Sequence, residues 1–373
     1  MLHKNQKVPV PKPGVLRISP YTQGASAVPG VAEPIKLSSN ELSCGPGPAA
    51  LKAYHDAAAT LHRYPDGSQT ELREAIAEVF ELNAANILCG NGSDELIQLV
   101  TRAFVGEGDE VLMSENCFLM CRIHALAQGA EVVIAPEKQD RVDVDALLSR
   151  VTDRTRLLTL ANPNNPTGTY IGAKEVRRLH SGLPGDVILL LDGAYAEFVT
   201  ESDYDAGAEL VLHNSNVVMT RTFSKIFGLS ALRVGWSYMP DGIHDAVQRI
   251  RTPFNANGPA MAAAAAAVRD TAYTDTIRRH NASALTTISG RLSALGLTVV
   301  PSVTNFYLIR FPDSCGTTAS ECSRQLEAAG IIPRPVGGDD DAELRITVGS
   351  DKENEAVLRV FESFMKNSVS KSA

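Results

Sequence analysis

Short apolar runs alternate with helical patterns between about residue 86 and residue 240, and this alternation restricts the possible folds more than any other feature of the chain. Apolar, partly β-branched runs are typical of strands that are buried on both faces of a parallel sheet. The clearest runs are residues 86–90, 157–161, 186–192 and 217–220. The sequence therefore predicts an α/β fold with a mostly parallel, doubly wound sheet. Ligands of such sheets bind at the carboxyl ends of the strands, so we expect a functional site there.

The two ends of the chain have different patterns. Residues 1–35 contain six prolines, which predict an extended arm because proline fixes φ and removes a backbone donor. We expect residues 36–260 to form a large domain, and residues 261–373 to form a smaller C-terminal α/β domain that also receives the arm. Ser68 and Glu71 have the spacing of a capping box, which predicts the start of a helix that reaches Phe80.

Composition and charge exclude several classes of protein. Of the 373 residues, 44% are hydrophobic and 21% are charged, which is typical of a globular enzyme and not of a disordered chain. The net charge of −8 argues against nucleic acid as a partner. The six cysteines form no metal-site pattern, and no apolar run has membrane-spanning length. We therefore expect no metal, no membrane association and a cytoplasmic location.

Lys225 follows the apolar run 217–220 and is flanked by Thr222 and Ser224, with Arg233 further along the chain. A lysine at the end of a strand can form an imine with an aldehyde cofactor, while nearby hydroxyl and guanidinium groups hold a phosphate. Pyridoxal phosphate has both of these features. Because most lysines are solvated surface charges, this interpretation depends on what the other strand ends carry.

Two of the other strand ends carry groups that would complement this cofactor. Asp192 ends the run 186–192, and a carboxylate there can keep the pyridine nitrogen of the cofactor protonated. Asn165 lies in a turn that two prolines and Gly168 make rigid, and it could donate a hydrogen bond to the ring oxygen. Tyr195 could donate to that oxygen from the other side. A helix cap or a plain loop is the alternative for each residue taken alone.

A further strand end is a glycine turn, in which Gly90 and Gly92 separate the run 86–90 from a helical pattern. Free N–H groups at the helix start, around Ser93 and Asp94, can bind the cofactor phosphate. Glu95 occupies the position of the last glycine in a nucleotide-binding fingerprint and no P-loop lysine follows, so nucleotide binding is disfavoured. Lysine, aspartate, asparagine and an anion site at four strand ends together predict one pocket for pyridoxal phosphate.

These motifs resemble those of the fold type I aminotransferases, and of the histidinol-phosphate aminotransferase family in particular, over nearly the whole chain. The Ser-Pro-Tyr and Tyr-Pro-Asp-Gly segments are the more specific part of this resemblance, because many aminotransferases share the cofactor motifs. The segments concerned are residues 17–21, 37–41, 63–67, 90–95, 162–168, 192–195, 222–233 and 344–349.

The resemblance implies roles for individual residues. The groups that would hold the cofactor phosphate are those of Ser93, Asp94, Thr222, Ser224 and Arg233, with Tyr64 reaching in from the other subunit of an obligate homodimer. Phe118 would stack on the cofactor ring. The substrate-binding residues would be Tyr21, Asn40, Arg334 and Arg345. Among these, Arg345 would bind a carboxylate, and Tyr21 and Arg334 would contact a distal phosphate, because the planar guanidinium suits both anions.

The activity that the resemblance implies is transamination of L-histidinol phosphate with 2-oxoglutarate in histidine biosynthesis, with Lys225 as general base and acid. An aromatic amino acid aminotransferase and, less favoured, a pyridoxal phosphate-dependent phospho-amino-acid decarboxylase are the alternatives on the same scaffold. A non-enzymatic, cofactor-sensing regulator is disfavoured because no basic DNA-binding segment is attached. Departures from the family lie on the substrate side, where residues 116–121 lack the expected tyrosines and Asp339 to Asp341 add negative charge.

Overall fold

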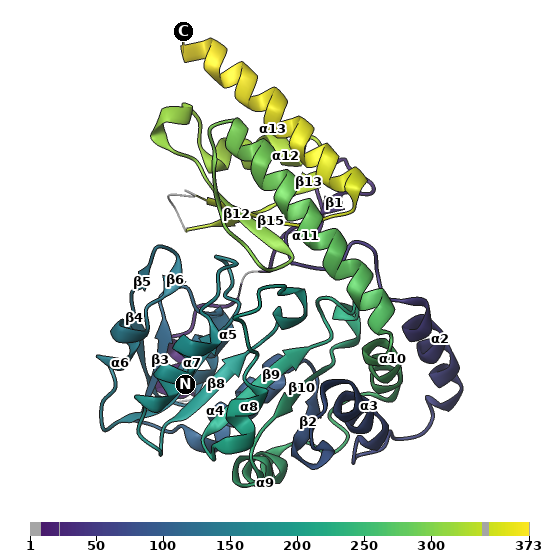
Figure 1. Cartoon of the computed structure of the whole chain (residues 1–373), viewed down its shortest axis with the longest axis vertical. Helices are drawn as coiled ribbons and strands as arrows, with labels where there is room; N and C mark the ends of the chain where they lie inside the picture. The colour runs from purple at the N-terminus through teal and green to yellow at the C-terminus, as the bar shows by residue number, and fades with distance from the viewer. Residues whose placement is uncertain (1–8, 22, 338–342, 373) are drawn as a thin grey trace, which may run out of the picture.

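Seven strands form the central sheet of the larger domain, in the order β2-β10-β9-β8-β7-β3-β4 (Figure 1). Their bounds are β2 Ile87–Gly90, β3 Glu110–Ser114, β4 Glu131–Ala135, β7 Thr155–Ala161, β8 Ile188–Asp192, β9 Val217–Thr222 and β10 Gly235–Tyr238. The computed structural model describes residues 9–21, 23–337 and 343–372. Strand β10 is antiparallel to both of its neighbours, and the remaining pairs are parallel. The mostly parallel sheet expected from the apolar runs is confirmed.

Helices cover both faces of this sheet, because successive residues of each strand point to opposite sides. Leu190 and Val218 belong to one core with α4 Ser93–Phe104, α5 Leu119–Ala127 and α9 Asp241–Ile250. Leu189 and Val217 belong to the core on the other face. That core includes α2 Pro48–Ala57, α3 Thr70–Phe80, α6 Val144–Leu148, α7 Ala173–Ser181, α8 Ala208–His213 and α10 Gly258–Arg269.

A four-stranded antiparallel sheet forms the smaller domain, in the order β11-β12-β15-β14. Its strands are β11 Thr298–Val300, β12 Phe306–Arg310, β14 Arg334–Val336 and β15 Glu343–Thr347. The helices that pack with it are α11 Thr271–Ala294, α12 Ala319–Ala328 and α13 Asp351–Ser372. The acidic residues Asp339 to Asp341 lie outside the described residues.

The N-terminal arm contacts both domains. Its strand β1 Ile35–Lys36 pairs in parallel with β13 Ile331–Ile332 of the small domain, as expected for an arm that this domain receives. Arg17 pairs with Glu131 of the large domain (2.9 Å). The expectation that the arm is extended throughout is wrong at α1 Pro13–Leu16, a single helical turn. Proline at the first helical position is compatible with such a turn, because the N–H that it lacks would have no partner within the helix.

The predicted capping box at Ser68 is wrong. Helix α3 begins at Thr70, and the carboxylate of Asp66 accepts the N–H groups of both Ser68 and Thr70 (2.8 Å each). Gln69 precedes the helix with a left-handed φ of 57°. Its buried side chain bonds both the N–H and the carbonyl of Cys89, so contact with the neighbouring strand sets this backbone conformation.

The packing of α10 bears on where the domains divide. Its alanines lie in the core of the large domain, beside α2 and α3. Helix α11 begins directly after Asp270, and three of its buried apolar residues, Leu285, Ile288 and Leu292, belong to the core of the small domain. We therefore propose a boundary near Asp270, beyond the expected residue 260.

Two smaller kinds of element complete the description. The hairpin β5 Glu137–Lys138 and β6 Arg141–Val142 extends toward the small domain, where Arg310 bonds Asp140 (2.8 Å). Short 3-10 helices are η1 Ala58–Thr60, η2 Ala84–Asn86, η3 Ala196–Phe198, η4 Ser230–Leu232 and η5 Asp313–Cys315. Among the helices described, none is both long and apolar enough to cross a membrane.

Candidate active site

A cavity of about 760 Å³ lies at the carboxyl edge of the large sheet, and residues of the small domain and of the arm also line it. All of the predicted site residues except Tyr64 line this cavity. They are Tyr21, Asn40, Ser93, Asp94, Phe118, Asn165, Asp192, Tyr195, Thr222, Ser224, Lys225, Arg233, Arg334 and Arg345. Residues distributed over more than 300 positions of sequence therefore meet in one place.

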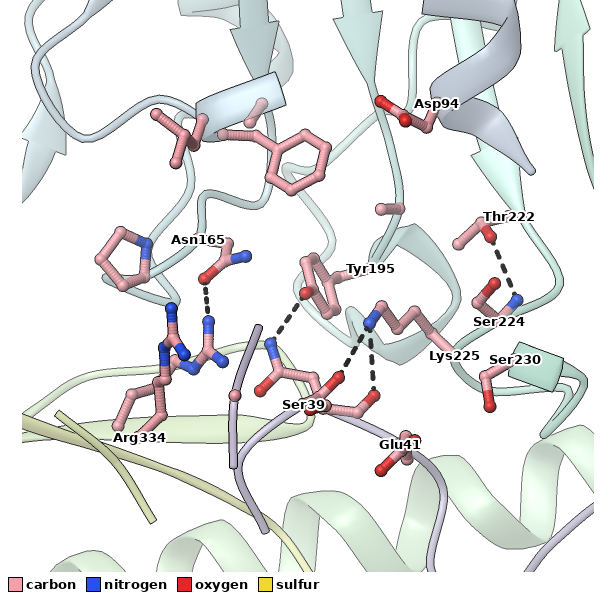
Figure 2. A pocket seen from close by; sticks show the side chains of 18 of the residues that line it. Ser39, Glu41, Asp94, Asn165, Tyr195, Thr222, Ser224, Lys225, Ser230 and Arg334 are labelled. Carbon is pink, nitrogen blue, oxygen red and sulfur yellow. Dashed lines mark hydrogen bonds between the residues drawn. The ribbon is translucent and has the colours of Figure 1, made fainter. Parts of the chain in front are cut away.

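Lys225 follows β9, and its amine points into the cavity beside Tyr195 (Figure 2). The Nζ atom donates to the backbone carbonyls of Ser39 (3.3 Å) and Asn40 (3.4 Å) and lies 5.5 Å from the centre of the Tyr195 ring. Burial lowers the pKa of Lys225 to about 8, and the nearby charge of Arg345 acts in the same direction. A neutral, nucleophilic amine is therefore accessible close to neutral pH.

Asp192, the last residue of β8, is buried and accepts a hydrogen bond from Thr220 of the adjacent strand (3.2 Å). Burial raises the pKa of its carboxyl group to about 6, and the negative charge of Asp94 adds to the increase. Because burial makes this carboxyl group costly to ionise, a cationic partner in the cavity would stabilise its ionised form. A protonated ring nitrogen would be such a partner.

Asn165 lies across the cavity from Ser224 (Figure 2), and it is hydrogen-bonded to Arg345, which also lines the cavity. The Nη1 atom of Arg345 donates to Oδ1 of Asn165 (2.5 Å), and Nη2 donates to the carbonyl of Ser38 (2.8 Å). The bond to Oδ1 leaves the amide nitrogen of Asn165 as its donor toward the cavity. Arg345 is buried, burial lowers its pKa, and its Nε atom has no partner among the described residues.

An anion site lies where β2 meets α4. Gly92 precedes Ser93 with a φ of 87°, and a side chain there would collide with the guanidinium group of Arg233. Gly235 of β10 has to be glycine as well, because a Cβ atom would overlap the backbone nitrogen of Ser93. Arg233 in turn donates to the hydroxyl oxygen of Ser224 (3.1 Å). N–H groups of a helix start, a hydroxyl and a guanidinium thus converge as a phosphate requires.

The remaining predicted residues differ in how they meet the cavity. Phe118 directly precedes α5 in the cavity wall, and Tyr21 and Arg334 line the side formed by the arm and β14. Asn40 is fully buried, and its amide donates to the hydroxyl oxygen of Tyr195 (2.9 Å). Tyr64 lies outside the cavity, is 82% exposed and stacks on Phe254 at 4.7 Å between ring centres.

Several groups in the site had not been predicted from the sequence. The carbonyls of Ser38 and Ser39 bond Arg345 and Lys225, and a backbone acceptor has no side-chain pattern by which it could be found. Thr220, which donates to Asp192, lies within the run that was assigned only to a strand. Glu41 lines the cavity and opposes the decrease in the pKa of Lys225.

The fold, and a cavity that combines a buried lysine amine with a cluster of anion-binding groups, are those of a cofactor-dependent enzyme. The chain belongs to the class I and II aminotransferase family, whose family model matches residues 32–361.

Individual relatives are similar over almost their whole length. The chain is 49% identical to the histidinol-phosphate aminotransferase of Paramagnetospirillum magneticum, covering 96% of this chain and 99% of that protein. It is 48% identical to the enzyme of the same name from Rhodopseudomonas palustris, covering 96% and 98%. A solved structure of histidinol-phosphate aminotransferase from Sinorhizobium meliloti in complex with pyridoxal 5'-phosphate superposes with a TM-score of 0.81. It is 30% identical, over 88% of this chain and 91% of that one.

Proposed function

We propose that this chain is a pyridoxal phosphate-dependent aminotransferase that converts L-histidinol phosphate and 2-oxoglutarate into imidazole acetol phosphate and glutamate. The observation that carries the proposal is a lysine of lowered pKa that shares one cavity with Asp192, Tyr195 and an anion site. The histidinol-phosphate aminotransferases that are nearly half identical to this chain support the choice of substrate.

Each residue around the lysine has a task that its position explains. When bound, the cofactor supplies an electron-accepting ring for charge that develops on the substrate α-carbon. Asp192 holds the proton on the ring nitrogen, and Tyr195 and Asn165 donate to the ring oxygen from two sides. Lys225 would hold the cofactor through its aldehyde and, as general base and acid, would move a proton between the substrate α-carbon and the cofactor carbon. Ser93, Asp94, Thr222, Ser224 and Arg233 hold the phosphate, and Phe118 stacks on the ring.

Two guanidinium groups would bind the substrates. Arg345 binds a carboxylate such as that of glutamate, because its amide and carbonyl partners fix the plane of its guanidinium. Arg334 lies close enough for its charge to lower the pKa of Arg345, and with Tyr21 it would contact the phosphate of the second substrate. One site can therefore take a dicarboxylate and a phosphorylated amine in turn.

Substitution of Arg334 tests the substrate assignment. We expect Arg334→Gln to raise KM for histidinol phosphate by about 10- to 100-fold, because one charge-assisted contact to phosphate is lost. KM for glutamate should change much less. Steady-state kinetics with histidinol phosphate, phenylalanine and tyrosine would be measured for both proteins. A wild-type kcat/KM for phenylalanine far above that for histidinol phosphate would favour the aromatic aminotransferase instead.

Cofactor attachment should depend on pH in a defined direction. Only the neutral amine attacks an aldehyde, and burial lowers the pKa of Lys225 to about 8. We therefore expect the rate of pyridoxal phosphate incorporation to rise about tenfold per pH unit below this value and to level off above it. Stopped-flow absorbance on the cofactor-free protein would follow the reaction. A plateau reached only near the pKa of an ordinary lysine would contradict the role of burial.

We also propose a homodimer in which Tyr64 reaches the cofactor phosphate of the partner. Its ring is largely exposed and lies apart from the cavity of its own chain, so it is free to contact another subunit. Sedimentation that gives a monomer for the active enzyme would contradict this arrangement.

A cytoplasmic location is consistent with six cysteines that are all free thiols.

A further inference from the structure

Asn40 lies where the arm, the large domain and the small domain meet, and both of its backbone groups are engaged. Its N–H donates to Oγ1 of Thr347 (2.9 Å), the last residue of β15, which is the strand that also carries Arg345. Its carbonyl accepts from Nδ2 of Asn305 (3.1 Å) and from Nζ of Lys225 (3.4 Å). The residue has a left-handed φ of 55° and is only 1% exposed. These contacts hold Asn40 in one position relative to the cavity.

The side chain of Asn40 is directed at one atom, the phenolic oxygen of Tyr195, to which its Nδ2 donates at 2.9 Å. A phenolic oxygen that accepts from an amide must point its own proton in another direction. The ring of Tyr195 cannot turn freely, because it is buried and packs edge-on against Phe306 at 5.2 Å. Its hydroxyl borders the cavity, close to Lys225 (Figure 2). The proton is therefore directed into the space where a cofactor ring would lie.

We propose that Asn40 is a positioning residue for Tyr195, whose hydroxyl it turns into a donor toward the ring oxygen of bound pyridoxal phosphate. This inference rests on the proposed function and assigns Asn40 to the cofactor side of the site, in place of the substrate contact that the family resemblance implied. Asn305 and Thr347 of the small domain contribute to this positioning, because their hydrogen bonds fix the backbone of Asn40. The donor geometry at the cofactor thus depends on how the small domain packs.

Loss of the hydrogen bond that Tyr195 donates to the ring oxygen should change the pH dependence of the cofactor's visible absorption. In the holoenzyme, the nitrogen of Lys225 shares its proton with the ring oxygen, and a donor to that oxygen reduces its basicity. Without the donor, the oxygen holds the shared proton more firmly, and the pH midpoint of the visible absorption change rises. One hydrogen bond to a charged acceptor corresponds to a rise of about one pH unit. A residue that only supports the fold would not move this midpoint.

The experiment is a double-mutant cycle between Asn40→Gly and Tyr195→Phe, read by spectrophotometric pH titration of the holoenzymes. Glycine keeps the left-handed backbone without strain while it removes the amide. We expect each single variant to raise the midpoint by about one pH unit and the double variant to raise it no further. A midpoint unchanged in Asn40→Gly, or two shifts that add, would overturn the proposal.

Two further variants keep the test decisive. Asn281→Ala is the matched control, because Asn281 is a buried asparagine of α11, in the small domain, that donates to the carbonyl of Thr304 (2.9 Å). It should lower stability and leave the midpoint unchanged.

If Asn40→Gly does not fold, Asn40→Asp keeps the shape of the side chain and forces Tyr195 to donate to it. Its midpoint should rise, and adding Tyr195→Phe should raise it no further. If the amide has the opposite orientation in the wild type, so that Tyr195 already donates to Asn40, then Asn40→Gly lowers the midpoint, and this result also overturns the proposal.

Failure of the inference can be told apart from failure of the proposed function. Borohydride reduction followed by peptide mapping should place the cofactor on Lys225 in the wild type and in Asn40→Gly. Absence of the label from wild-type Lys225 would reject the cofactor assignment itself. A label on Lys225 with an unshifted midpoint would reject only the role of Asn40.

Discussion

Lys225→Ala should abolish transamination while leaving the fold intact. The variant loses both the attachment point of the cofactor and the group that moves the proton, and general acid–base catalysis alone contributes about 10²- to 10⁴-fold. We therefore expect the rate of the glutamate half-reaction to fall by at least about 10⁴-fold. Rapid-mixing absorbance would measure this rate, and circular dichroism would report the fold. The cofactor should still bind, without covalent attachment, through the anion site.

The matched control is Lys174→Ala, which removes a lysine of α7 that lies outside the cavity lining. This variant should retain wild-type rates. Full activity of Lys225→Ala, or a reduced label on another lysine, would contradict the role of Lys225 and with it the proposed mechanism.

Asp192→Asn should have the second largest effect on activity. The amide keeps the shape of the carboxylate but cannot hold a proton on the ring nitrogen by charge, so the ring accepts electrons less well. Loss of one group that stabilises developing charge costs about 10²- to 10³-fold, and we expect kcat to fall by this factor. Single-turnover measurement with glutamate would test the expectation. An almost unchanged kcat would show that this carboxylate does not face the cofactor.

The same substitution should stabilise the cofactor-free protein. Burial raises the pKa of Asp192 from 3.8 to about 6, so in this pH window the folded protein binds more protons than the unfolded one. The free energy of unfolding then falls as pH rises through the window, by roughly 3 kcal/mol in total. An uncharged amide at this position would carry no such cost, so Asp192→Asn should be more stable than the wild type at about pH 7 and similar near about pH 4. Urea denaturation of both cofactor-free proteins would measure the difference.

A buried carboxylate at the amino-terminal end of a parallel strand of the same sheet, away from the cavity, provides the control for both effects. Glu110, at the start of β3, accepts hydrogen bonds from Thr152 (2.6 Å) and Thr155 (3.4 Å). Glu110→Gln should leave kcat unchanged and should not stabilise the protein near about pH 7, because this carboxylate has partners that its burial requires. A gain in stability equal to that of Asp192→Asn would mean that the effect is not specific to the site.

Much of the fold and of the cofactor site could be predicted from the sequence because both are encoded locally. The runs that contain Leu189 and Val217 are continuously apolar at residues 187–191 and 217–219, as is typical of strands buried on both faces. The chemistry at their ends follows from the topology, since parallel strands bring Asp192 and Lys225 to the same edge. Local signals of this kind need no knowledge of how distant segments meet.

Tertiary structure decided what distant segments do to one another. Gln69, and not Ser68, sets the start of α3 because its amide bonds Cys89. The carbonyl of Ser39 lies at Lys225 because β1 draws the segment after the arm beneath the small domain. The family resemblance implied a substrate contact for Asn40, whereas its contacts with Tyr195 and Thr347 are the basis for the positioning role that we propose. A side chain's type limits which bonds it can form, but the packing of the two domains selects the partner.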